Sequence, residues 1–113
     1  MTRDILFLLA PGFEDKGRRE FCPECAEIWG VLHYFPAIKE ALDIRYQPLL
    51  HPRPDLVDML GDGDWNCPTL ILAKGADVGP NAKIQTAKGV RFLDNARDIA
   101  AYFAHRYGTP SPR

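Results

Sequence analysis

The clearest chemistry in this sequence lies in two cysteines that are three positions apart. They form the run Cys22-Pro23-Glu24-Cys25, where an apolar helical pattern begins. Such a pair beside a strand–helix–strand pattern is typical of redox thiols. With Cys22 as the N-cap and Pro23 as the first helical residue, the Cys22 sulfur would face unpaired backbone N–H groups and the positive end of the helix dipole. Both favour the thiolate, so we expect Cys22 to be the nucleophile and Cys25 the resolving thiol.

The elements that must position these thiols begin with a buried strand. Ile5–Leu9 is a continuous apolar run that stops at a Pro-Gly pair, which favours a strand buried on both faces. The charged stretch 11–21 predicts an exposed loop. Apolar positions in 25–35 follow helical spacing, and 43–49 suggests a second strand. Together these elements make a strand–helix–strand unit with a right-handed crossover.

The second half of the chain predicts a strand–strand–helix arrangement. A short helix and two strands are expected at 54–60, 69–73 and 90–93. Asp94 or Asn95 can cap a final helix, which Gly108 terminates. The sequence therefore predicts an α/β fold with a mixed four-stranded sheet and helices on both faces. We expect one domain over residues 1–108 and a short tail over 109–113.

The composition limits the classes of partner. The chain has 113 residues, and its 14 Lys and Arg against 15 Asp and Glu give a net charge of −1. A protein of nucleic acid or membrane surfaces would carry clustered positive charge, so we expect neither partner. The longest apolar run, residues 5–10, is too short to cross a membrane and makes a poor secretion signal. Three cysteines, an odd count, fit a cytoplasmic protein whose thiols do chemistry or bind metal.

Three stretches of the chain carry a resemblance to known proteins. Residues 22–25, Cys-Pro-Glu-Cys, resemble the Cys-Pro-x-Cys active site of glutaredoxins. Residues 67–75, which begin with Cys-Pro-Thr, resemble the stretch of thioredoxins that holds their cis-proline. Residues 89–103 are similar to the end of the thioredoxin-like domain of glutathione transferases. The whole chain also resembles an uncharacterised bacterial family of small thioredoxin-like proteins. The resemblance implies the thioredoxin-like fold and a thiol–disulfide oxidoreductase of thioredoxin or glutaredoxin type.

The resemblance also implies which residues bind substrate. Pro68 would be the cis-proline that lies against the two active thiols, and it would shape the substrate groove together with Pro23, Cys67 and Thr69. The partner would be a protein disulfide or a small thiol of the glutathione type. The protein would hold no bound cofactor, and it would be a monomer or a homodimer.

Glutathione as a co-substrate would need its own contacts. Asp94 and Asn95 match in position the acidic-polar pair that holds the γ-glutamyl end of glutathione in glutathione transferases. Arg45, Arg53 and Arg91 are candidate binders of an anionic substrate, although scattered arginines usually serve as a solvated surface. As the N-cap of a helix, Asp94 also has a sufficient structural role.

The third cysteine leaves alternatives open. In the thioredoxin-like fold the residue before the cis-proline contacts the active site, so the resemblance implies that Cys67 lies near Cys22. Cys67 is then a small buried core residue, a partner in an alternative disulfide, or a third ligand with Cys22 and Cys25 in a metal or iron–sulfur site. The alternative to catalysis is a thioredoxin-like binding domain without turnover, or a metal-binding protein that uses the three thiols.

Overall fold

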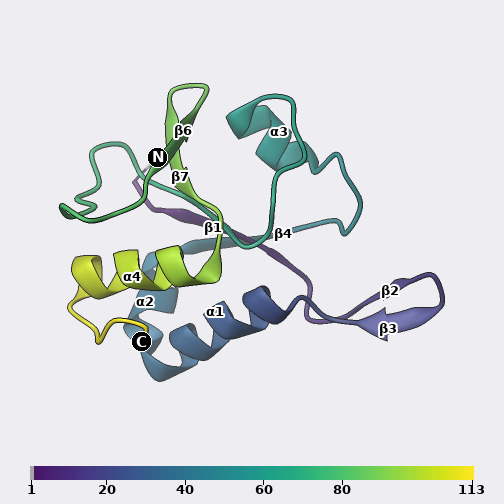
Figure 1. The fold of residues 1–113 in the computed structure, drawn as a ribbon, viewed down its shortest axis with the longest axis horizontal. Coiled ribbons are helices and arrows are strands. Elements are labelled where there is room, and N and C mark those ends of the chain that lie inside the picture. Colours follow the sequence, from purple (N-terminus) through teal and green to yellow (C-terminus); the bar gives the residue numbers. More distant parts are fainter. Residues whose placement is uncertain (1) are drawn as a thin grey trace.

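Five strands form the central sheet of the computed structural model, which describes residues 2–113 (Figure 1). These strands are β1 (Ile5–Leu9), β4 (Asp43–Gln47), β5 (Thr69–Ile71), β6 (Gln85–Ala87) and β7 (Val90–Leu93). The helices are α1 (Pro23–Tyr34), α2 (Pro36–Ala41), α3 (Pro54–Leu60) and α4 (Ala96–Tyr107). A separate hairpin consists of β2 (Phe13–Asp15) and β3 (Arg18–Glu20). The protein thus has the α/β class that its sequence predicts.

Strand β1 lies inside the sheet, whose order is β4-β1-β5-β7-β6, because all five of its residues are apolar and buried. It pairs in parallel with β4, which confirms the predicted strand–helix–strand unit. It pairs antiparallel with β5, and β5 pairs antiparallel with β7. Because β1 runs toward α1, its last residue, Leu9, lies beside the first turn of that helix, where its N–H contacts Cys25.

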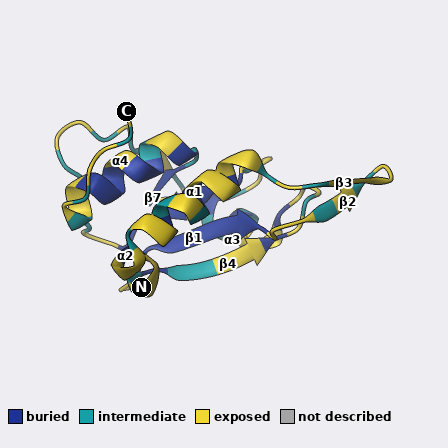
Figure 2. Ribbon diagram, turned by 90° about the horizontal axis from the view of Figure 1, so that it is seen from below, coloured by how far each residue is buried: buried dark blue, intermediate teal, exposed yellow. Residues whose placement is uncertain are grey.

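Helices cover both faces of the sheet, as predicted. Helices α1 and α4 pack against each other on one face, and α3 lies on the other (Figures 1 and 2). Helix α1 buries Ile28 and Leu32 at helical spacing, and α3 buries Leu56 and Leu60. Within residues 2–113, no helix is long and apolar enough to span a membrane.

The sheet has one strand more than the four predicted. Strand β6 pairs antiparallel with β7, with Ala87 opposite Val90. The two residues between them, Lys88 and Gly89, have φ values of 51° and 73°. Left-handed φ at both central residues is the geometry of the type I′ turn that joins two strands tightly. The prediction missed β6 because this edge strand is polar and lacks the alternation of apolar residues that marks a half-buried strand.

The charged stretch predicted as a loop contains the β2–β3 hairpin, which projects from the body of the molecule beyond the start of α1 (Figures 1 and 2). Its turn also has left-handed φ at a Lys-Gly pair, Lys16 and Gly17. Opposite charges face each other across the two strands, since Glu14 pairs with Arg19. Cross-strand charge pairs stabilise a hairpin that has little apolar surface to bury. The hairpin leads the chain directly to Cys22.

Candidate redox site at the start of α1

Cys22 is the N-cap residue of α1, as the sequence predicts. Its backbone is extended, with φ −77° and ψ 115°, and Pro23 takes the first helical position. The Cys22 Sγ accepts a hydrogen bond from the backbone N–H of Cys25 at 3.1 Å. The side chain is partly exposed. The sulfur therefore sits at the positive end of the helix dipole, where negative charge is favoured, and solvent can reach it.

Cys25 lies one turn further along α1 and is buried, with 4% of its surface exposed. Its Sγ accepts a hydrogen bond from the backbone N–H of Leu9 at 3.5 Å. Burial, followed by the hydrogen bond with Cys22, raises the pKa of the Cys25 thiol to about 12. Cys25 is therefore a protonated thiol at neutral pH.

The loop before β5 brings Cys67 and Pro68 to the same place. The Cys67–Pro68 peptide bond is cis, as the resemblance implies for Pro68. The Cys22 thiol donates a hydrogen bond to the carbonyl oxygen of Cys67, with Sγ and O 3.7 Å apart. Thr69 is buried, and its hydroxyl donates to the carbonyl of Asn66 at 2.6 Å, so its side chain supports the loop.

A buried arginine, Arg53, binds the loop before β5 through the carbonyl oxygen of Trp65. Arg53 has only 6% of its surface exposed, and its guanidinium donates to three backbone carbonyls, those of Pro48, Leu49 and Trp65, at 2.9–3.0 Å. Burial raises the pKa of Cys67 to about 11, and the nearby Arg53 charge acts in the opposite direction. Arg53 is thus not free to bind an anionic substrate. Its role was invisible in the sequence, because its three acceptors are backbone atoms that only the fold brings together.

The start of α4 adjoins the start of α1 through Glu24. The Glu24 Oε1 accepts a hydrogen bond from the backbone N–H of Ala96 at 3.0 Å. Asn95 caps α4, since its side chain accepts from the N–H of Asp98 at 2.9 Å. Asp94 accepts from the side chain of Gln85 at 2.7 Å. Both residues expected to hold glutathione therefore have partners within the chain, and a carboxylate of the protein already occupies the N-terminal end of α4.

Replacing Glu24 by alanine is expected to lower the free energy of unfolding by about 0.5–2 kcal/mol, because it removes the acceptor of a helix N-terminal N–H group. The matched control is Glu27→Ala on the same helix, which breaks only an exposed ion pair with Arg97 and should cost less. Chemical denaturation of both variants checks the difference. Equal losses in the two variants would show that the Glu24–Ala96 contact contributes nothing of its own.

An apolar cavity of about 420 Å³ opens beside Cys22. Both Cys22 and Cys25 line it, together with apolar side chains that include Phe21, Trp29 and Tyr46. Phe21 and Tyr46 are large residues with 61% and 49% of their surface exposed. Among the described residues that line this cavity, none is charged. The Cys22 sulfur is therefore at the edge of a surface suited to apolar groups.

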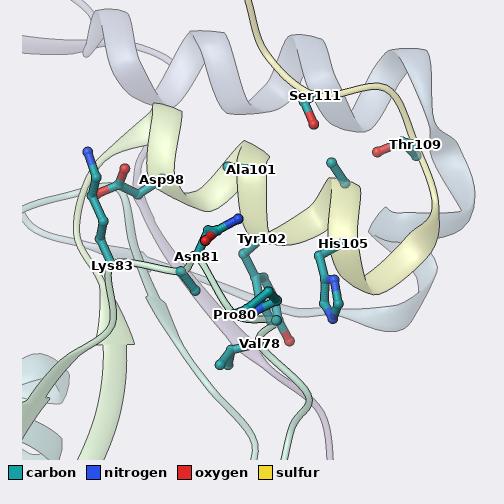
Figure 3. A pocket seen from close by; sticks show the side chains of 13 residues that line it. Val78, Pro80, Asn81, Lys83, Asp98, Ala101, Tyr102, His105, Thr109 and Ser111 are labelled. Atoms are coloured by element: carbon teal, nitrogen blue, oxygen red, sulfur yellow. The ribbon is translucent and has the colours of Figure 1, made fainter.

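A larger cavity, of about 510 Å³, lies away from the thiols. It is bounded by the loop 78–83, the outer side of α4 and residues of the C-terminal tail (Figure 3). Lys83 and Asp98 lie at one end and His105 at the other. None of the residues predicted as catalytic or substrate-binding lines it. This cavity is therefore separate from the predicted site residues.

The metal alternative gains no support from the placement of the side chains. Among residues 2–113, no group of three or more His, Cys, Asp or Glu is arranged to hold a metal ion, and this includes the three cysteines. Two of the histidines instead approach single carboxylates, His51 near Asp64 and His105 near Asp77.

Ionisation of Cys25 is expected to weaken the reduced protein in alkaline solution. A thiol in the unfolded chain ionises near pH 9.0, whereas burial holds the Cys25 pKa at about 12 in the folded protein. Between these values the unfolded chain binds fewer protons than the folded chain, so the free energy of unfolding falls as pH rises through this window. Denaturant unfolding of the reduced protein on both sides of pH 9.0 measures the slope. Cys25→Ala should reduce the slope without abolishing it, because burial also raises the pKa of Cys67 to about 11, and an unchanged slope in that variant would contradict the assignment.

Comparison with known proteins assigns the chain to a family. Neither the curated proteins nor the solved structures contain a match to the chain. The family model described as "Protein of unknown function (DUF3088)" matches residues 3–111, which is nearly the whole chain. The chain therefore belongs to the DUF3088 family.

Proposed function

We propose that this chain is a thioredoxin-like thiol–disulfide oxidoreductase with Cys22 as the nucleophile and Cys25 as the resolving thiol. One observation carries the proposal: a partly exposed cysteine caps a helix, and a buried cysteine one turn on donates its backbone N–H to that sulfur at 3.1 Å. The order β4-β1-β5-β7 supports the thioredoxin-like assignment, because it joins a parallel strand–helix–strand unit to an antiparallel pair followed by a helix.

The reaction is an exchange of disulfide bonds. The Cys22 thiolate attacks one sulfur of a substrate disulfide, a mixed disulfide forms, and the other substrate sulfur leaves as a thiolate. Cys25 loses its proton and attacks the Cys22 Sγ. The mixed disulfide breaks, the Cys22–Cys25 disulfide forms, and the second substrate thiolate leaves. Two protein thiols are oxidised and one substrate disulfide is reduced, with the protons passing to the products.

The proposed substrate is a disulfide in a protein segment. The cavity beside Cys22 offers apolar and aromatic surface and no charge, which suits an apolar segment. Glutathione fits the same surface less well, since it is a charged tripeptide and the side chains of Asp94 and Asn95 are occupied. The proposed compartment is the cytoplasm, where reducing conditions return the protein to its dithiol form.

The reduction potential tests this function. After equilibration in glutathione buffers of graded composition, the fraction of Cys22–Cys25 disulfide is measured by peptide mass mapping. We expect a single transition between about −270 and −200 mV, the range of thioredoxins and glutaredoxins. If Cys22 and Cys25 remain reduced when oxidised glutathione is in large excess, the pair is not a redox couple and the function is a binding domain without turnover.

A further inference from the structure

Two cysteines lie close to Cys22, and the proposed function uses only one of them. Its Sγ accepts the N–H of Cys25 at 3.1 Å, and it lies 3.7 Å from the carbonyl oxygen of Cys67. The carbonyl carbon of Cys67 is one bond of about 1.2 Å from that oxygen, so the Cys22 sulfur lies within about 5 Å of the Cys67 backbone. Cys67 is therefore a direct neighbour of the Cys22 sulfur.

The charge around Cys67 differs from that around Cys25. Arg53 is fixed by its carbonyl contacts behind the Cys67 loop, and its charge favours the Cys67 thiolate. Burial raises the pKa of both thiols, but only the pKa of Cys67 is also lowered by a neighbouring arginine. Disulfide exchange proceeds through the thiolate, so the Arg53 charge favours the form of Cys67 that can attack Cys22.

We propose that Cys67 is a second resolving thiol, which attacks the mixed disulfide at Cys22. This inference rests on the proposed function, because it needs Cys22 to form a mixed disulfide. The Cys67 thiol loses its proton, and its sulfur bonds to the Cys22 Sγ. The bond between Cys22 and the substrate breaks, and the substrate leaves as a thiolate that takes up a proton. Two electrons pass from the Cys22 and Cys67 thiols to the substrate disulfide, which is the oxidant.

The Cys22–Cys67 disulfide would then be a state of the protein in its own right. Cys25 can attack it, which releases Cys67 as a thiol and forms the Cys22–Cys25 disulfide without any change in the number of oxidised thiols. The oxidised protein would thus exchange between two forms, one with a Cys22–Cys67 disulfide and one with a Cys22–Cys25 disulfide. Cys67 precedes Pro68 in the loop that would form the substrate groove. The Cys22–Cys67 disulfide would therefore also block substrate binding in this groove.

Variants with one or both partner thiols removed test the inference. Reduced Cys25→Ser protein is mixed with one equivalent of a short aromatic peptide disulfide, and release of the second peptide thiol is followed. We expect release at least about tenfold faster than from the Cys25→Ser/Cys67→Ser double variant, which should keep the peptide attached. Peptide mapping should find a Cys22–Cys67 disulfide in the single variant. If Cys25→Ser keeps the peptide attached as firmly as the double variant does, Cys67 does not resolve and the inference fails.

The same series separates this inference from the proposed function. The wild-type protein retains all three thiols, so it should release both peptide thiols, which shows that the assay reports a complete reaction. If no variant that retains Cys22 ever captures the peptide, the proposed function itself fails. Because serine is polar and position 25 is buried, Cys25→Ala is run in parallel, and it should give the same outcome. Thermal unfolding of each variant confirms that it is folded.

Discussion

Replacement of Cys22 by serine is expected to abolish disulfide reduction, with a loss of more than about a thousandfold in rate, the scale on which removal of a covalent nucleophile acts. A serine hydroxyl stays protonated at neutral pH and cannot exchange with a disulfide. The fold should be unaffected, because serine is a favoured N-cap and its oxygen can still accept the N–H of Cys25. Steady-state reduction of a peptide disulfide, with an external reductant to regenerate the dithiol, measures the rate.

Glu27→Ala provides the control for this loss. It removes only an exposed ion pair with Arg97 from the same helix and leaves all three thiols in place, so it should retain turnover. A Cys22→Ser protein that is folded and reduces the peptide at the wild-type rate would place the chemistry elsewhere. Comparable losses in both variants would indicate damage to the site and not removal of the nucleophile.

Replacement of Asp4 by alanine is expected to lower the free energy of unfolding by about 2–5 kcal/mol, a large part of the 5–15 kcal/mol typical of a domain. Asp4 is buried next to β1. One carboxylate oxygen accepts the backbone N–H of Ala73 at 2.7 Å, and the other accepts the hydroxyl of Tyr102 on α4 at 2.5 Å. Without the carboxylate, each buried donor left unsatisfied costs about 1–3 kcal/mol.

Three variants sharpen this prediction. Asp4→Asn should lose less than Asp4→Ala, since its amide oxygen can still accept the N–H of Ala73. Tyr102→Phe removes only one of the two donors to Asp4. Its loss in the free energy of unfolding should fall between those of Asp4→Asn and Asp4→Ala. Asp58→Ala, at an exposed position on α3, should change the free energy by less than about 0.5 kcal/mol. Urea denaturation that finds Asp4→Ala as stable as Asp58→Ala would refute the role of the buried carboxylate.

The parts of the fold that follow from the sequence are those with strong local signals. The five apolar residues of β1, followed by a Pro-Gly stop, favoured a buried strand, and Gly61 ends α3 where predicted. Asn95 and Gly108 cap the two ends of α4, with the glycine in the left-handed conformation. The position of Cys22 as an N-cap followed from Pro23, which suits the first turn of a helix.

The features that could not be predicted are those in which polar residues meet across the fold. Strands β2, β3 and β6 have little buried apolar surface, and only the Lys-Gly turns signal them. The contact of Glu24 with the start of α4 spans 72 positions, and that of Asp4 with Tyr102 spans 98. Arg53 binds carbonyl groups, which every residue has. No spacing in the sequence marks such partners, because they are set by the packing of whole elements.

A single turnover followed by intact mass measurement tests the central claim most directly. Reduced protein is mixed with one equivalent of an aromatic peptide disulfide. The reaction is quenched in acid, and the intact mass of the protein is measured by mass spectrometry. The proposed chemistry predicts a protein mass lower by about 2 Da, from the loss of two thiol hydrogens, together with two free peptide thiols. The Cys22→Ser protein should show no change in mass. A wild-type protein whose mass also stays unchanged, with the peptide disulfide intact, would contradict the claim that Cys22 and its neighbouring thiol form a redox site.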